Sequence, residues 1–73
     1  LLIYPNPTKG ELIIKTNLSE INFINFSVHN ILGNQVFKGK TRNKISLSMV
    51  PSGFYFIELN INNQLKVFKI QKI

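Results

Sequence analysis

The stretch YFIELNI at residues 55–61 carries an apolar side chain at every second position, namely at Tyr55, Ile57, Leu59 and Ile61. A period of two is typical of a half-buried β-strand, because successive side chains of a strand point to opposite faces of the sheet. Asn62-Asn63 follows and is expected to turn the chain back, since asparagine favours tight turns. The stretch therefore predicts a long strand that pairs with a second strand at residues 65–70.

The apolar positions of this second strand change parity. Leu65 and Val67 are odd-numbered, whereas Phe68 and Ile70 are even-numbered. A β-bulge near Val67-Phe68 would return both pairs to the core, because a bulge adds one residue to one strand of a pair. The alternative is that both faces of the strand are partly covered.

Turn-forming residues recur about every ten residues along the rest of the chain, which is the spacing of an antiparallel β fold. We expect turns or loops at residues 5–10, 17–22, 33–34, 39–44 and 51–53. Gly33-Asn34 supplies the positive φ angles of a tight hairpin, so Ile31-Leu32 should pair with residues 35–37. Gly53 is expected to have a positive φ angle in the turn before the long strand. Tyr55 is expected to begin the core face with its hydroxyl at the rim.

Alternation within the remaining segments predicts which side chains are buried. The expected core positions are Leu12, Ile14, Ile24, Phe26 and Val28, together with Leu18 and Ile21 from the loop at residues 17–22. Asn25, Ser27 and His29 should face the other side of their strand. The chain thus contains about seven strands and no helix, which predicts a small antiparallel β-sandwich or a barrel.

The inventory of reactive side chains argues against an enzyme. The chain has no cysteine, a single histidine (His29) and three carboxylates, Glu11, Glu20 and Glu58. General acid–base catalysis needs a positioned histidine or a pair of carboxylates, whereas His29 is expected to be exposed on the polar face of its strand. No cofactor motif or metal-ligand spacing is present, so we expect neither a cofactor nor a metal. No stretch approaches the roughly 20 apolar residues that a transmembrane helix requires.

The net charge of +6 favours a polyanionic partner, which is nucleic acid, anionic lipid or an acidic protein groove. The basic residues gather in the loop at residues 38–44 and at Lys66, Lys69 and Lys72. The last three recur every three residues along a strand of period two, so they cannot share one face without a bulge. They either protect the strand edge from aggregation or form a basic strand that an acidic groove or an added strand captures.

Four motifs occur in order along the chain: Tyr4-Pro5-Asn6-Pro7-Thr8-Lys9-Gly10, then residues 28–36 (VHNILGNQV), then residues 45–48 leading into Pro51-Ser52-Gly53-Phe54-Tyr55, and finally residues 65–72 (LKVFKIQK). With these motifs, residues 1–73 closely resemble the C-terminal sorting domain of the type IX (Por) secretion system of Bacteroidetes. The resemblance implies an Ig-like sandwich of about seven strands, at the end of a larger exported protein.

The same resemblance implies a function and partners. The domain would direct a covalently attached N-terminal cargo through an outer-membrane translocon, by way of the periplasm, to the cell surface or the medium. A sortase-like peptidase would usually remove it on arrival. The residues carried over as recognition signals are Gly53, Tyr55, Lys66, Lys69 and Lys72, and the family's opening turn corresponds to Pro5, Asn6, Pro7 and Gly10.

The alternative function is a basic binding module, either a sandwich for glycans or an OB-like barrel for nucleic acid. In the second case Phe54 and Phe56 would form a platform on which bases stack. The spacing of lysine and arginine between the aromatic residues is not that of an RNA-recognition motif, so we expect no nucleic-acid partner.

Overall fold

The longest strand pair of the molecule is β6 (Gly53–Ile61) against β7 (Gln64–Lys72). Its antiparallel register runs without a break from Ile61 opposite Gln64 to Gly53 opposite Lys72. Asn62 and Asn63 form the connecting turn with φ angles of 50° and 62°. Two successive positive φ angles match the right-handed twist of the strands on either side, so the predicted turn is confirmed and closes a tight hairpin.

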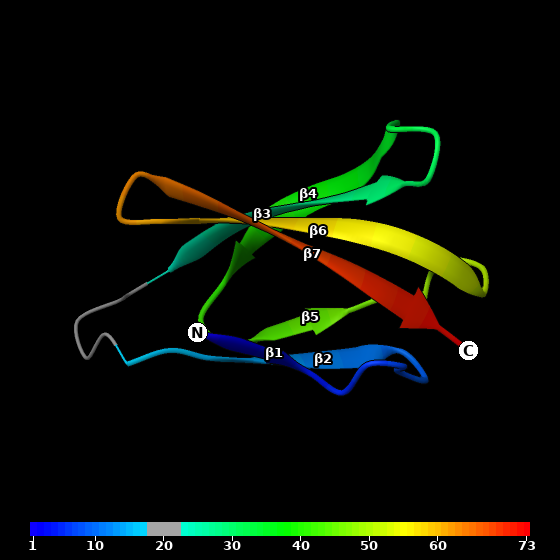
Figure 1. The fold of residues 1–73 in the computed structure, drawn as a ribbon, viewed down its shortest axis with the longest axis horizontal. Helices are drawn as coiled ribbons and strands as arrows, with labels where there is room; N and C mark the ends of the chain where they lie inside the picture. The colour runs from blue at the N-terminus through cyan, green and yellow to red at the C-terminus, as the bar shows by residue number, and fades with distance from the viewer. Residues whose placement is uncertain (18–22) are drawn as a thin grey trace.

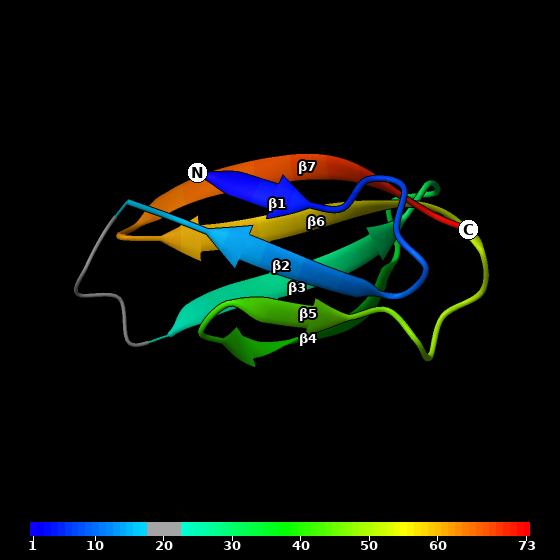
Figure 2. The ribbon, with the colours of Figure 1, turned by 90° about the horizontal axis from the view of Figure 1, so that it is seen from below.

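The computed structural model describes residues 1–17 and 23–73, which form two antiparallel sheets (Figure 1). The larger sheet has the order β4-β3-β6-β7, in which β3 spans Ile24–Asn30 and β4 spans Gln35–Thr41. The smaller has the order β1-β2-β5, and its strands span Leu2–Tyr4, Glu11–Lys15 and Lys44–Ser46. Figure 2 shows the smaller sheet lying across the larger one.

The described residues form seven strands, and their arrangement confirms the predicted all-β sandwich. The sheets stay separate and do not close into a barrel, which excludes the OB-like alternative. The strand order is that of an Ig-like sandwich, because β1, β2 and β5 share one sheet while β3, β6 and β7 share the other. Within the described residues, no helix is long and apolar enough to cross a membrane.

Side chains from both sheets meet in one core. The smaller sheet and the segment after it contribute Leu12, Ile14, Ile45 and Leu47, and the larger sheet contributes Ile24, Val28, Tyr55, Ile57, Leu59, Ile61 and Ile70. Phe26 is half-buried against this cluster. The alternating faces predicted for β2, β3 and β6 are therefore confirmed, because each strand buries one face and exposes the other.

The prediction of a bulge in the last strand is wrong. The even-numbered Phe68 and Ile70 point toward the smaller sheet, and Ile70 is fully buried. The odd-numbered Leu65 and Val67 point outward and remain 60% and 53% exposed. The fold leaves two apolar side chains in solvent rather than breaking the β6–β7 ladder to bury them. A register irregularity occurs instead between β3 and β4, at Val28 and His29.

Two predicted turns also differ from the structure. Ile31 and Leu32 do not pair with β4; they lie in the turn between β3 and β4 and are 65% and 80% exposed. Gly33 has the expected positive φ of 88°. The segment predicted as a loop at residues 39–44 is mostly strand, because β4 continues to Thr41 and β5 begins at Lys44. The predicted loop at residues 17–22, with Leu18 and Ile21 in the core, lies almost wholly outside the described residues.

Leu59→Ala should lower the free energy of unfolding by about 3 kcal/mol, because it leaves a cavity where a fully buried side chain packs. Leu32→Ala is the matched control at an exposed position and should change the value by less than about 0.5 kcal/mol. Urea denaturation followed by circular dichroism measures both. Equal losses for the two variants would contradict the assignment of the core.

Candidate functional site

The opening corner of the chain, residues 5–8, is hydrogen-bonded to the end of the last strand. The Asn6 side chain donates from Nδ2 to the Lys69 carbonyl at 3.1 Å and accepts from the Gln71 N–H at 3.0 Å. The Thr8 backbone then donates to the Gln71 carbonyl and accepts from the Ile73 N–H, both at 2.9 Å. In Figure 2 the segment after β1 accordingly passes beside the C-terminal end of β7. The Asn6 amide thus takes the place of a peptide group in a short parallel ladder.

The two prolines of this corner explain why the ladder takes this form. The Tyr4–Pro5 and Asn6–Pro7 peptide bonds are both cis. Neither proline has an N–H to donate to a neighbouring strand. The contacts with β7 therefore come from the side chain of Asn6 and the backbone of Thr8.

Thr8 and Gly10 connect the corner to the smaller sheet. The Thr8 side chain is 1% exposed, and its hydroxyl donates to the Glu11 carbonyl at 2.7 Å and accepts from the Gly10 N–H at 3.1 Å. The Gly10 carbonyl accepts from the Leu47 N–H at 2.6 Å. The buried hydroxyl is satisfied by these bonds, and the corner is held to both sheets at once.

The Gly53-Tyr55 motif and Lys72 meet around the loop that leads into β6. The Tyr55 hydroxyl donates to the Pro51 carbonyl at 2.6 Å, and the ring is 6% exposed. A tyrosine near the start of this strand that bonds back to the preceding loop is the tyrosine corner of Ig-like sandwiches. The Lys72 Nζ donates to the Val50 carbonyl at 2.5 Å, and Gly53 opposite it has a φ of 154°. These three residues therefore hold the loop and the end of β7 together.

Lys66 and Lys69 are placed differently from Lys72. Lys69 lies on the outer face of the larger sheet, with its Nζ 5.0 Å from the centre of the Phe54 ring, which is a cation–π contact. Lys66 lies on the opposite face, nearer the β6–β7 turn, and is exposed. The structure thus confirms that the three lysines do not share one face. It also shows that Phe54, which is 46% exposed, has a cation over its ring.

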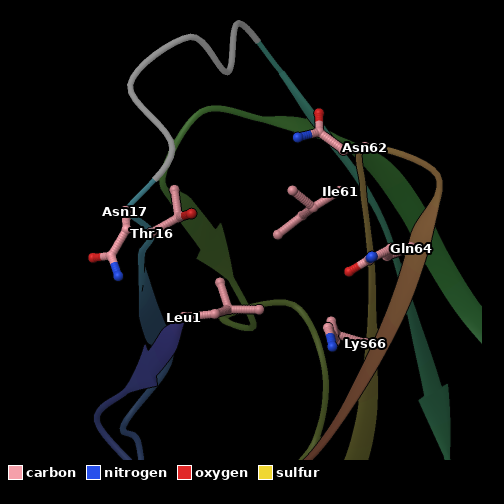
Figure 3. A pocket seen from close by; sticks show the side chains of 7 residues that line it. All are labelled: Leu1, Thr16, Asn17, Ile61, Asn62, Gln64 and Lys66. Atoms are coloured by element: carbon pink, nitrogen blue, oxygen red, sulfur yellow. The ribbon is translucent and has the colours of Figure 1, made fainter.

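An open pocket of about 370 Å³ lies at the end of the sandwich near the β6–β7 turn (Figure 3). Its described lining consists of Leu1, Thr16, Asn17, Ile61, Asn62, Gln64 and Lys66. Lys66 is the only ionisable side chain in that lining. The described lining therefore contains no acid–base pair and no set of metal ligands.

His29 is not simply exposed, as the sequence predicted, but belongs to a polar cluster on the outer face of the larger sheet. Its Nε2 lies 3.0 Å from the Ser27 hydroxyl and 3.4 Å from Glu58 Oε2, and Ser27 also donates to Glu58 at 3.1 Å. A catalytic triad needs the carboxylate on the other ring nitrogen, where it orients the base. Here both partners contact the same nitrogen, so the cluster lacks that order. Among the described residues, no group of three or more His, Cys, Asp or Glu could hold a metal ion.

The second basic segment is a sheet edge rather than a loop. Lys38 and Lys40 lie on β4, and Lys44 forms an exposed ion pair with Glu11 at 3.7 Å. The Arg42 guanidinium lies 5.5 Å from the centre of the Phe23 ring. Lys38 and Lys40 lie at the opposite edge of the larger sheet from β7, with β3 and β6 between them.

Comparison with known proteins identifies the whole chain with one family. The family model that matches is described as a secretion system C-terminal sorting domain, and it covers residues 2–73. A search of curated proteins gave no match. The matched region includes both the corner and the end of β7, which the fold brings together.

Tyr55→Phe should lower the free energy of unfolding by about 1 kcal/mol, because it removes the hydrogen bond to Pro51 and leaves the ring in place. Tyr4→Phe is the matched control, since that ring is 44% exposed and should cost nothing measurable. Thermal or urea denaturation compares the two. A loss no larger than that of the control would show that the tyrosine corner contributes no stability.

Asn6→Ala should cost about 1 kcal/mol of stability and speed the hydrogen exchange of the Gln71 amide, because two hydrogen bonds to β7 are lost. Asn25→Ala, on the exposed face of β3, is the control for removing an asparagine side chain. Exchange measured by mass spectrometry or NMR reports on the site directly. Unchanged exchange at Gln71 in the Asn6 variant would contradict the capping role.

Proposed function

This chain belongs to the family of secretion system C-terminal sorting domains, and on that basis we propose that residues 1–73 are the C-terminal signal domain of a larger exported protein. The family implies a sorting signal for type IX secretion. The domain directs an N-terminally attached cargo across the outer membrane, by way of the periplasm, to the cell surface or the medium. Sorting domains of this family are in general non-catalytic, and we extend that to this chain.

The partners that we propose are an outer-membrane translocon, which recognises the folded domain, and a sortase-like peptidase, which removes the domain on arrival. The observation that carries the proposal is the family match over residues 2–73. Its support in the structure is that the first and last of the four ordered motifs contact each other, through Asn6 and Thr8 against the end of β7. A signal made of distant segments needs a fold that brings them together.

The proposed recognition residues divide into two roles. Gly53, Tyr55 and Lys72 hold the end of β7, as the Val50 and Pro51 contacts indicate, and so act by positioning the signal. The side chains of Lys66 and Lys69 make no hydrogen bond to the described residues, and both are exposed. They lie on β7, the last strand of the region that the family model matches. We assign direct contact with the translocon to these two lysines.

The test is a fusion of residues 1–73 to the C-terminus of a reporter that carries its own Sec leader, expressed in a bacterium with a type IX system. The reporter should be found at the cell surface or in the medium, and it should stay in the periplasm when the system is deleted. Fractionation and immunoblotting measure the distribution. Retention of the reporter in the periplasm of the competent strain would contradict the proposed function.

The double variant Lys66→Glu/Lys69→Glu should reduce export of this reporter at least roughly tenfold, the effect of losing about 1.4 kcal/mol of binding free energy. Lys38→Glu/Lys40→Glu makes the same charge change on β4 and should leave export unchanged. Both pairs lie at exposed positions, so the fold should survive, which circular dichroism checks. Equal reductions would show that overall charge, and not these two lysines, determines export.

A further inference from the structure

We propose that the open half of the β7 edge, residues 65–69, captures a short acidic segment of the translocon as an added β-strand. The inference rests on the proposed function and names the way in which the signal is bound. Its three supports are the direction of the backbone groups along β7, the exposed apolar side chains there, and the charge beside them.

The outer edge of β7 is only half covered. Gln71 directs both its N–H and its carbonyl away from β6, to Asn6 and Thr8. In an antiparallel pair the outward-facing residues alternate with those that bond the partner strand, so Val67 and Leu65 also direct both groups outward. The corner reaches no further along this edge than the Lys69 carbonyl. In the described part of the chain no second strand pairs with β7, so the outward groups of Leu65 and Val67 and the N–H of Lys69 are open.

The corner itself demonstrates that this edge accepts another strand. Thr8 pairs in parallel with Lys72, and Asn6 continues the same row of hydrogen bonds to Lys69. The preceding residues then lead away into β1, which belongs to the other sheet. An added segment along residues 65–69 would extend a ladder that the molecule has already begun, with main-chain bonds giving most of the affinity.

The side chains along residues 65–69 favour the binding of an added strand over the protection of the edge from aggregation. Sheet edges are usually guarded by charged residues or proline, yet Leu65 and Val67 are 60% and 53% exposed on the outer face. They offer two apolar positions against which alternate side chains of an added strand can pack. Lys66 and Lys69 lie on either face of the same segment and favour carboxylates in the partner.

The net positive charge of the domain also indicates which kind of segment binds at this edge. A second copy of this domain would bring another net charge of +6 to the same edge, which opposes self-association. The occupant that fits is an extended segment of about five residues, with apolar side chains facing Leu65 and Val67 and acidic side chains near the two lysines. We assign this segment to the translocon protein that binds the signal.

Val67→Pro in the reporter fusion tests the backbone contact. It removes an N–H that points to solvent, a position at which an edge strand tolerates proline. Lys40 lies on β4, the opposite edge strand of the same sheet, and pairs with Asn25. By the same alternation of inward and outward backbone groups, the N–H of Lys40 also points to solvent, so Lys40→Pro is the matched control. Val67→Ala keeps the N–H and shortens the side chain.

Val67→Pro should lower export at least tenfold while the domain remains folded, whereas Lys40→Pro should stay within twofold of the unsubstituted fusion. Val67→Ala should lower export less than Val67→Pro, because it loses side-chain packing and keeps the N–H. Export of the folded Val67→Pro variant at the unsubstituted level would overturn the inference and leave the proposed function standing. Failure of the unsubstituted fusion to be exported would overturn both.

Two further measurements cover the remaining outcomes. If Val67→Pro does not fold, Val67→Glu is compared with Val36→Glu, since Val36 is also exposed and lies on β4. Loss of export for the first alone supports capture at β7, and equal export overturns it. Light scattering of the purified fusion should show a monomer. A dimer that Val67→Pro dissolves would mean that a second copy occupies the edge, which would also overturn the inference.

Discussion

The hydrogen bonding of the opening corner to the end of β7 is the contact on which the arrangement of this domain depends. Asn6 bonds Lys69 and Gln71, which lie 63 and 65 positions away in the chain. Thr8 extends this ladder and, through its buried hydroxyl and Gly10, connects it to the smaller sheet. Elsewhere the two sheets meet mainly through packed apolar side chains, which are not directional. The corner therefore supplies the directional bonds that fix the end of the last strand.

Contacts of this kind indicate that several residues of the family motifs act first on the fold. Tyr55 and Lys72 donate hydrogen bonds to the Pro51 and Val50 carbonyls of the loop before β6, and Gly53 pairs with Lys72, so the first effect of these residues is on the fold. In a domain of 73 residues, where stability is marginal, residues of this kind influence recognition simply by keeping the signal in one conformation. Fewer of the motif residues are therefore left to contact a partner directly, and those that we propose lie in the first half of β7.

Local pattern was enough to predict most of the fold. The alternation at residues 55–61, the Asn62-Asn63 turn and the buried faces of β2 and β3 follow from the period of two and from turn preferences, which depend only on neighbouring residues. The extent of β4 was missed because its glycine and lysines resemble a loop, whereas pairing with β3 holds them in a strand. The family resemblance, drawn from four ordered motifs, was confirmed over residues 2–73.

The sequence by itself therefore determined the strand content, the central apolar face and the family, because each of these depends on the residue pattern within short segments. The tertiary structure alone decided which face of β7 is buried. The smaller sheet covers Ile70 but not Leu65 or Val67, and the unbroken register with β6 prevents a bulge from correcting this. It also decided that Asn6 caps the strand carrying the lysines, since a contact across 63 positions leaves no periodic trace in the chain.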